Sequence, residues 1–271
     1  MYSNFRSSQT ANNVAWRLNY CWRVFATGSS FLLFGVGGAS IATVIALLLL
    51  LIPAKILCRK VAMRYCLSLA FKIYIHILRF LGLLTFEIQN IERIKPTGQL
   101  VIANHPSLLD VVFLISLIRN ADCIVKSALW NHPLTALPVR VAGYVRNVPE
   151  RLLEESVSSL AQGNSLIVFP EGTRSRPNRQ LSFLRGAANI ALSGNKNITP
   201  IVICCEPITL LKDQKWYDVP EYPPHYHIRV LPEIGLGEVV EQGVPQCKAA
   251  RQLTRHMEGL FETERMDASL A

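Results

Sequence analysis

The sequence predicts an α/β fold, a mixed sheet flanked by helices, preceded by an N-terminal membrane helix and an amphipathic interfacial helix. Three observations predict it. An uncharged apolar stretch lies near the N-terminus, a second apolar stretch carries a polar stripe, and from Thr85 onward short β-rich runs alternate with amphipathic ones. Such alternation, with almost wholly apolar strands, is typical of a sheet covered on both faces. We therefore divide the 271 residues into a tail (1–30), a membrane region (31–84) and an α/β domain (85–271).

The membrane region begins with the stretch from Phe31 to Ile52, which is 22 residues long and carries no charge. About 20 apolar residues are enough to cross the hydrocarbon core of a bilayer. A cleaved signal peptide has a shorter apolar region nearer the N-terminus, so we interpret the stretch as a retained anchor. A buried core helix is the alternative, and the glycines between Gly35 and Gly38 leave a kink or a re-entrant path open.

The charges that flank the anchor predict its orientation. Cations are more numerous after it than before it: Lys55, Arg59, Lys60 and Arg64 against Arg17 and Arg23. Positive residues favour the cytoplasmic side, so we expect a cytoplasmic (inner) membrane protein whose α/β domain faces the cytoplasm.

The second apolar stretch runs from Val61 to Leu83 and carries polar residues at intervals of three or four. These residues share one side of a helix: Lys60, Arg64, Ser68, Lys72, His76 and Arg79. The pattern favours a helix in the headgroup region whose cations contact lipid phosphates. A second spanning helix is disfavoured because burying its cations is costly, and packing against the anchor or the α/β domain stays open.

Charge and cysteine content narrow the class of partner. The net charge is +9, which suits a partner that carries phosphate. The cations lie beside apolar stretches rather than among aromatic side chains, so we expect membrane phospholipids and no nucleic acid as the partner. The seven cysteines are odd in number and have no CxxC spacing, which is typical of reduced thiols. No metal site is indicated, because the nearby histidines lack ligand spacing.

The α/β domain shows its elements as alternating patterns. The predicted strands are Thr85–Gln89, Gln99–Ala103, Asp122–Lys126, Ser165–Phe169, Ile198–Cys204 and His227–Leu231. The predicted helices are Ser107–Leu117, Glu150–Gln162, Phe183–Ser193 and Pro245–Glu262. Prolines between 220 and 224 indicate an irregular loop before the last strand.

The first unusual cluster follows the second predicted strand and reads Asn-His-Pro-Ser-Leu-Leu-Asp from Asn104 to Asp110. Residues five apart on one helix point about 140° away from each other, so His105 must lie just outside the helix to meet Asp110. Pro106 suits the first helical position and would start a helix directly after the histidine. An aspartate that accepts from one imidazole nitrogen leaves the other as a base; a coincidental surface pair is the alternative.

The second cluster follows a buried strand and reads Phe-Pro-Glu-Gly-Thr-Arg-Ser from Phe169 to Ser175. Backbone amides at Gly172 and Thr173, together with the guanidinium of Arg174, can hold a phosphate monoester. Glu171 can accept from a polyol hydroxyl or position the arginine. Further positive charge can come from Lys126 and Arg185, with a solvated loop as the alternative.

Taken together, a His-x4-Asp motif followed about 60 residues later by Phe-Pro-Glu-Gly-Thr-Arg-Ser closely resembles the glycerolipid acyltransferase family. Its type members are the 1-acylglycerol-3-phosphate acyltransferases, and the resemblance runs from about Thr85 to Glu262. Lys126 resembles the family's substrate-contacting lysine, and Arg185 lies in a block like the one that follows the glutamate motif. Pro200 resembles the fourth motif. A two-helix membrane element before the domain also fits this family.

The resemblance implies an O-acyltransferase of the lysophospholipid acyltransferase type. His105, held by Asp110, would take the proton of a lipid hydroxyl as it attacks an acyl thioester. The acyl donor would be acyl-CoA or acyl-carrier protein as a co-substrate, with no further cofactor and no metal. The implied substrate-binding residues are Asn104, Lys126, Arg146, Glu171, Gly172, Thr173, Arg174 and Arg185.

One departure keeps the acceptor open. The family has a glycine, a few apolar residues and then a phosphate-binding arginine, whereas here Gly143 is followed by Arg146 and Arg151 at other offsets, with Asn147 between them. The acceptor expected first is 1-acylglycerol-3-phosphate, which would give phosphatidic acid. Alternatives are another lipid alcohol in a specialised pathway, or a catalytically inactive lipid-binding membrane protein.

Overall fold

A seven-stranded sheet forms the centre of the fold, in the order β1-β7-β6-β2-β5-β3-β4. The computed structural model describes residues 2–270 apart from 54, 176–178, 212–213 and 242. Its strands are β1 (Thr85–Gln89), β2 (Leu100–Ala103), β3 (Ala121–Val125), β4 (Val145–Arg146), β5 (Ser165–Val168), β6 (Ile198–Glu206) and β7 (His225–Val230). Neighbouring strands run parallel except β6 and β7, which are antiparallel. The predicted mixed sheet is confirmed.

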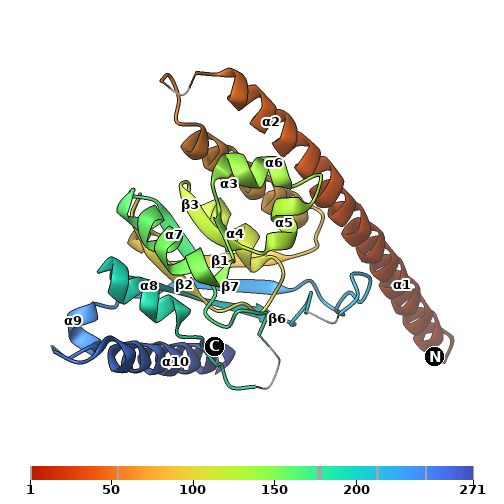
Figure 1. The fold of residues 1–271 in the computed structure, drawn as a ribbon. Coiled ribbons are helices and arrows are strands. Elements are labelled where there is room, and N and C mark those ends of the chain that lie inside the picture. The colour runs from red at the N-terminus through yellow and green to blue at the C-terminus, as the bar shows by residue number, and fades with distance from the viewer. Residues whose placement is uncertain (1, 54, 176–178, 212–213, 242, 271) are drawn as a thin grey trace.

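Helices cover both faces of the sheet, as Figure 1 shows. The helices of the α/β domain are α4 (Asp110–Leu117), α5 (Ser127–Asn131), α6 (Ala136–Ala142), α7 (Pro149–Ala161), α8 (Gly186–Gly194), α9 (Leu236–Val239) and α10 (Gln246–Leu270), with a 3-10 turn at Ile91–Arg93. Successive residues of β2 point to opposite faces. Val101 therefore joins a core under α3, α4 and α6, whereas Ile102 joins a second core under α7, α8 and α10.

The predicted strands all form, β1 with its predicted ends and the others with shifted ends, and one difference that bears on the site lies at the start of the helix predicted at Ser107. The helix predicted at Ser107 begins only at Asp110, and residues 106–109 form a turn instead. The reason is that the carboxylate of Asp110 accepts the backbone N–H of Ser107 (2.7 Å), which holds the segment as a turn. Pro106 therefore does not start a helix. The strand β7 also begins two residues earlier than expected, at His225.

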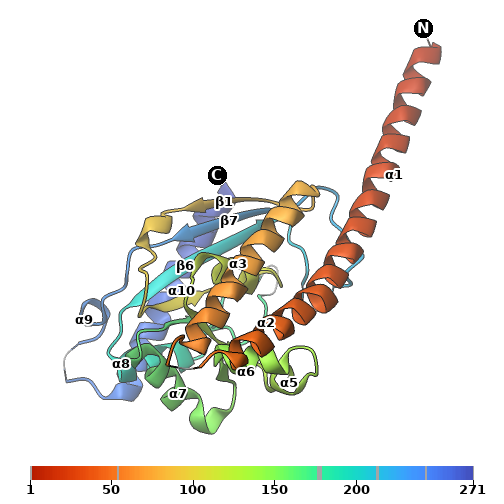
Figure 2. The same ribbon diagram turned by 90° about the horizontal axis from the view of Figure 1, so that it is seen from above.

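The N-terminal region is one long helical path. It consists of α1 (Tyr2–Leu32), a π-helical segment (Leu33–Gly38) and α2 (Ala39–Leu51). The π-helical segment contains the glycines between Gly35 and Gly38, and the path bends between α1 and α2 (Figure 2). Within the described residues, Trp16–Leu51 and α3 (Arg59–Phe80) are long and apolar enough to cross a membrane.

The polar stripe of α3 does not lie on one lipid-facing side, which corrects the expectation for this helix. Arg64 and Ser68 are buried against the α/β domain, with 2% and 4% of their surface exposed. Arg64 pairs with Asp122 (2.9 Å) and donates to the carbonyls of Ala142 and Gly143, so the domain satisfies its charge. The exposed side of α3 instead carries an apolar row at every fourth residue: Val61, Tyr65, Leu69 and Ile73.

Candidate active site

The two sequence motifs meet because of the sheet topology. Strands β2, β5, β3 and β4 are parallel neighbours, so their carboxyl ends lie at one edge of the sheet. Open α/β sheets bind their ligands at such an edge. His105 follows β2 and Glu171 follows β5, and the backbone N–H of His105 donates to Oε1 of Glu171 (2.8 Å). The predicted histidine and glutamate therefore share one site.

The His105–Asp110 pair closes across the turn. Nδ1 of His105 lies 2.9 Å from Oδ2 of Asp110, and the histidine side chain is 18% exposed whereas the aspartate is fully buried. With Nδ1 bonded to the carboxylate, Nε2 is the nitrogen left to act on a substrate. The five-residue spacing is bridged by a turn in which the Ser107 N–H donates to the carboxylate, rather than by a helix start at Pro106.

Burial controls the charge of Asp110. Desolvation raises the pKa of its carboxyl to about 6, against the opposing effects of His105 and the Ser107 amide. The second oxygen, Oδ1, is buried and has no hydrogen-bond partner among the described residues. An imidazole that donates to this carboxylate therefore relieves a costly buried charge, which fixes the orientation of the ring.

Aromatic residues also position the histidine, and the sequence did not single them out. The ring of Phe169 stacks on His105 with centroids 4.3 Å apart and planes 25° apart. Beneath the turn, Oγ of Ser107 lies 2.8 Å from the hydroxyl of the buried Tyr226. Phe169 belongs to the second motif and follows a strand end, and this position was the one signal in the sequence that it could lie at the site. Tyr226 is distant in sequence and gave none.

Glu171 holds the two motifs together. Its Oε1 accepts from the His105 amide and from the hydroxyl of Ser175 (2.8 Å), while the Ser175 amide donates to the carbonyl of His105 (2.7 Å). Burial raises the pKa of the Glu171 carboxyl, and the hydrogen bond from His105 opposes that shift. Glu171 therefore fixes the loop after β5 against the turn that begins at His105.

The rest of the glutamate loop is turned outward. Gly172 has φ +66°, and a Cβ there would lie 2.9 Å from Leu184, so the turn needs glycine. Thr173 is exposed. Nη1 of Arg174 donates to the carbonyl of Leu210 (2.6 Å). A guanidinium has five N–H donors, so this bond orients Arg174 and leaves donors for an anion.

Asn104 lies at the end of β2 and is 1% exposed. Its amide donates to the carbonyl of Ile203 and accepts from the Ile203 amide, both at 2.8 Å. These two bonds lock the end of β2 to β6, so Asn104 positions the histidine that follows it.

The remaining three cations are exposed and more peripheral. Lys126 precedes α5, and Arg146 ends β4, where its Nε lies 3.4 Å from the hydroxyl of Ser127. These two share the carboxyl edge with the dyad, since Val125 and Arg146 are paired in register. Arg185 precedes α8. Within the described residues, none of the three side chains hydrogen-bonds His105 or Asp110.

An apolar cavity of roughly 160 Å³ opens beside the turn that joins His105 to Asp110. Leu108 and Leu109, which lie within this turn, form part of the cavity wall. The other walls come from α1, from α3 and from the loop between β6 and β7; they include Phe31, Phe34, Tyr74, Leu78, Leu210 and Trp216. Leu210, which lines the cavity, also accepts the hydrogen bond from Arg174, so the glutamate loop contacts the cavity wall at this residue.

Comparison with known proteins matches the part of the chain that contains both motifs. The model of the Acyltransferase family matches residues 85–204. A 1-acyl-sn-glycerol-3-phosphate acyltransferase of Limnanthes douglasii is 32% identical over 126 residues, which cover 43% of this chain and 44% of the relative. The protein of the same name from Helicobacter pylori is 29% identical over 132 residues, 46% of this chain and 56% of the relative. The chain thus spans about half the length of these relatives.

The fold has a counterpart among solved structures. The 1-acyl-sn-glycerophosphate (LPA) acyltransferase PlsC from Thermotoga maritima superimposes with a TM-score of 0.69 at 18% identity, covering 92% of this chain and 97% of the other. At that identity the likeness concerns the fold. Because it covers nearly the whole chain, it extends to the N-terminal helices that the sequence matches leave out.

Proposed function

We propose that this chain, whose residues 85–204 match the model of the Acyltransferase family, is a membrane-bound O-acyltransferase that esterifies a lysophospholipid. The acceptor proposed first is 1-acyl-sn-glycerol 3-phosphate, the substrate in the names of the relatives. The donor is an acyl thioester, either acyl-CoA or acyl-carrier protein. The observation that carries the proposal is the dyad, in which a buried carboxylate orients a partly exposed imidazole across a turn whose leucines line an apolar cavity.

The reaction follows from the orientation of His105. Nε2 takes the proton of the acceptor hydroxyl as that oxygen attacks the thioester carbonyl carbon. The new C–O bond forms, the C–S bond breaks, and the imidazolium returns its proton to the departing thiolate. Asp110 accepts from Nδ1 throughout and stabilises the positive ring. An ester and a free thiol are produced, and no acyl group is held by the protein.

The glutamate loop is the proposed headgroup site. Arg174 is anchored to Leu210 by one donor, so its remaining donors present a preset fork for a phosphate. Gly172 and Thr173 belong to the same exposed turn. The peripheral cations, Lys126 and Arg146, add positive charge at the same edge of the sheet.

The apolar cavity is the proposed site for an acyl chain. Its wall includes the two leucines of the catalytic turn, so a chain in the cavity places its carbonyl end near His105. Helix α1 forms another wall, and α1, α2 and α3 expose many large apolar side chains. An acyl chain can thus enter from a lipid surface without crossing water.

The position of Arg146 supports a second class of acceptor. Arg146 lies at an offset unlike that of the family arginine, and it contacts Ser127 rather than the glutamate loop. Another lipid alcohol, acylated by the same chemistry, is therefore the second candidate.

The test is the product formed by purified protein. Wild-type protein is incubated with 1-acylglycerol-3-phosphate and an acyl thioester, and the lipids are identified by mass spectrometry. His105→Ala should abolish the product, whereas His256→Ala, an exposed histidine on α10, should not. Phosphatidic acid supports the first acceptor, and acylation of other lysolipids only would support the second. If His105→Ala is as active as wild type, the mechanism is wrong.

A further inference from the structure

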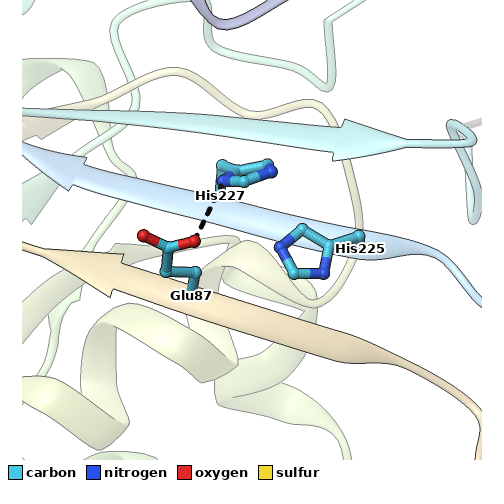
Figure 3. Close-up of side chains that lie close together, drawn as sticks. All are labelled: Glu87, His225 and His227. Atoms are coloured by element: carbon cyan, nitrogen blue, oxygen red, sulfur yellow. Dashed lines mark ion pairs between the residues drawn. The ribbon is translucent and has the colours of Figure 1, made fainter. Parts of the chain in front are cut away.

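A second group of ionisable side chains lies on β1 and β7, the two strands at the opposite end of the strand order from β4. It consists of Glu87 on β1 and His225 and His227 on β7 (Figure 3). The two strands run parallel, with Glu87 paired to His227 and Thr85 paired to His225. Residues two apart on a strand point to the same face, so both histidines project together. Sequence spacing did not indicate this group because its carboxylate comes from a distant strand.

The ligand atoms of the three side chains converge. One nitrogen or oxygen from each lies within 4.8 Å of the others. Nδ1 of His227 is 4.0 Å from Oε2 of Glu87, and the two imidazole centroids are 4.3 Å apart. Figure 3 shows a ring nitrogen of His225 turned toward the other two side chains.

A further residue orients the first histidine. Oγ1 of Thr85 lies 2.7 Å from Nδ1 of His225, which leaves Nε2 of that ring as its ligand atom. A hydrogen bond to the second ring nitrogen is the usual way in which a metal-binding histidine is held.

Packing does not account for the group. His227 and Glu87 are 47% and 53% exposed, and their 4.0 Å separation makes a weak ion pair. The residues that alternate with them, Tyr226 and Ile228, fill the core on the other face.

We propose that Glu87, His225 and His227 bind a Zn²⁺ ion, independently of the acyltransferase reaction. Imidazole and carboxylate are zinc ligands, and three protein ligands leave one position for water. Mg²⁺ and Ca²⁺ prefer oxygen ligands alone, so two imidazoles disfavour them. Zn–N distances of 2.0–2.1 Å place tetrahedral ligand atoms about 3.3 Å apart, so these exposed side chains must close slightly around the ion.

The position of the site gives it a structural consequence. His225 directly follows Pro224, which lines the apolar cavity, and the Thr85 amide donates to the carbonyl of Pro224 (3.0 Å). A bound ion would join β1 to the start of β7. It would thereby fix the end of the loop between β6 and β7, which forms one wall of the cavity. The bound ion should therefore stabilise the protein as well as occupy its ligands.

The experiment measures Zn²⁺ binding to the full chain, purified in detergent without a polyhistidine tag and stripped of metal. Thiols are first blocked with N-ethylmaleimide, because Cys21, Cys58 and Cys247 are exposed. Calorimetric titration should show one Zn²⁺ per chain, with no binding of Mg²⁺. A hundredfold excess over Kd should raise Tm by roughly 5 °C.

Three variants complete the test. His225→Ala/His227→Ala should lose the site, and Glu87→Gln, which keeps the shape of the side chain, should weaken binding at least tenfold. His256→Ala is the matched control on α10 and should bind as wild type does. Each variant is checked by circular dichroism for wild-type helix content. The proposal is overturned if wild type binds no zinc, or if the double variant binds it equally well.

Discussion

At the scale of single residues, the site depends on one buried carboxylate. Asp110 has no exposed surface, yet it must be ionised to accept from Nδ1 of His105. Its pKa of about 6 results from desolvation, which is only partly offset by the imidazole and the Ser107 amide. The pH at which the dyad works is therefore determined by the cost of burying this charge.

The first prediction concerns that pH dependence. We expect kcat/KM to fall as the pH drops through about 6, because protonated Asp110 can no longer accept from His105. Asp110→Asn should lower kcat by about 10²- to 10⁴-fold and flatten this limb of the profile. A steady-state pH profile of both proteins measures it. A wild-type rate that is flat between pH 5 and 7 would contradict the assignment.

Stability should respond in the opposite direction. A carboxyl whose folded pKa lies above its ordinary value of 3.8 is destabilising when ionised. This group therefore costs stability above pH 6, and the cost is relieved as the pH falls from about 6 toward 3.8. Loss of activity in this window should thus occur without unfolding, and thermal melts at each pH provide the control.

A second residue-scale prediction concerns Arg174, which is anchored to the carbonyl of Leu210. Arg174→Ala should raise KM for a phosphorylated acceptor by roughly 10- to 100-fold, since charge-assisted hydrogen bonds contribute about 1.5–3 kcal/mol. Arg174→Lys keeps the charge but loses the planar fork of N–H donors, so its acceptor KM should lie between those of the wild type and Arg174→Ala. The KM for the acyl thioester should not change. An unchanged acceptor KM in Arg174→Ala would remove this residue from the headgroup site.

At the scale of elements, α3 is held to the sheet by a buried ion pair. Arg64 on α3 and Asp122 on β3 are each 2% exposed and lie 2.9 Å apart. Asp122 also accepts from the hydroxyl of Ser159 and from the Val145 amide. Burial still raises the pKa of Asp122 more than Arg64 lowers it, so the pair fixes the position of α3 rather than adding net stability.

The third prediction follows from this ion pair. Asp122→Ala should lower the free energy of unfolding by about 3–5 kcal/mol, because it leaves Arg64 buried without a counter-charge. Arg64→Met/Asp122→Leu removes both charges and should cost far less than the two single changes together. Thermal unfolding in detergent measures both. Additive losses would show that the two residues act separately.

The cavity gives the fourth prediction. The ring of Trp216 lines it and lies 2.9 Å from where a Cβ of Gly28 on α1 would stand. Trp216→Ala should enlarge the cavity and shift donor preference toward longer acyl chains. Two more buried methylene groups, at about 0.8 kcal/mol each, correspond to about tenfold in kcat/KM. In Trp216→Ala/Gly28→Leu, the leucine occupies space that the indole has left and should return the preference toward that of the wild type. Competition between donors of different length tests both.

Elements with a strong periodic pattern were predictable from the sequence, whereas those held by long-range contacts were not. Strand β1 was predicted with its observed ends because Thr85–Gln89 forms a compact β-rich run. The two-residue strand β4 and the short helices α5 and α6 carry too few residues for a period to show. The stripe on α3 was expected to lie on one lipid-facing side, but Arg64 is buried against Asp122, a partner that lies far along the chain.

The candidate site shows the same limit. Local order and residue type indicated His105, Asp110 and the glutamate loop, because these residues follow strand ends. The way in which the dyad closes could not be predicted, since a local bond from the Ser107 amide outweighed the preference of Pro106 for a helix start. The roles of Phe169 and Tyr226 depend on the sheet order, which no short motif encodes.

At the scale of the whole molecule, α2 lies beside the α/β domain, whereas the N-terminal part of α1 projects away from it (Figures 1 and 2). Nε1 of Trp22 donates to the carbonyl of Leu81, and the hydroxyl of Thr43 lies 3.2 Å from the carbonyl of Leu134. Through these bonds the helical path contacts the segment after α3 at Trp22 and the α/β domain at Thr43. A helix that crossed the bilayer in this position would draw the polar surface of the domain into the hydrocarbon.

These contacts favour a path that lies in one leaflet, with the outward apolar side chains of α1, α2 and α3 in the lipid. If the helical path from α1 to α2 stays in one leaflet instead of crossing the bilayer, both of its ends lie on the same side of the membrane as the α/β domain. The positive charges after α2 then favour the cytoplasmic leaflet of the membrane, whose surface is anionic.

The final prediction tests this arrangement with the protein's own thiols. Cys21 and Cys58 lie on either side of the apolar stretch, Cys247 lies on the α/β domain, and all three are exposed. In sealed inside-out vesicles, a membrane-impermeant maleimide should label all three, and in right-side-out vesicles none. Single-cysteine variants, read by mass spectrometry, separate the sites. Labelling of Cys21 from the side opposite to Cys58 would instead show that the helix crosses the membrane. Labelling of Cys247 in right-side-out vesicles would show that the α/β domain lies on the other side of the membrane.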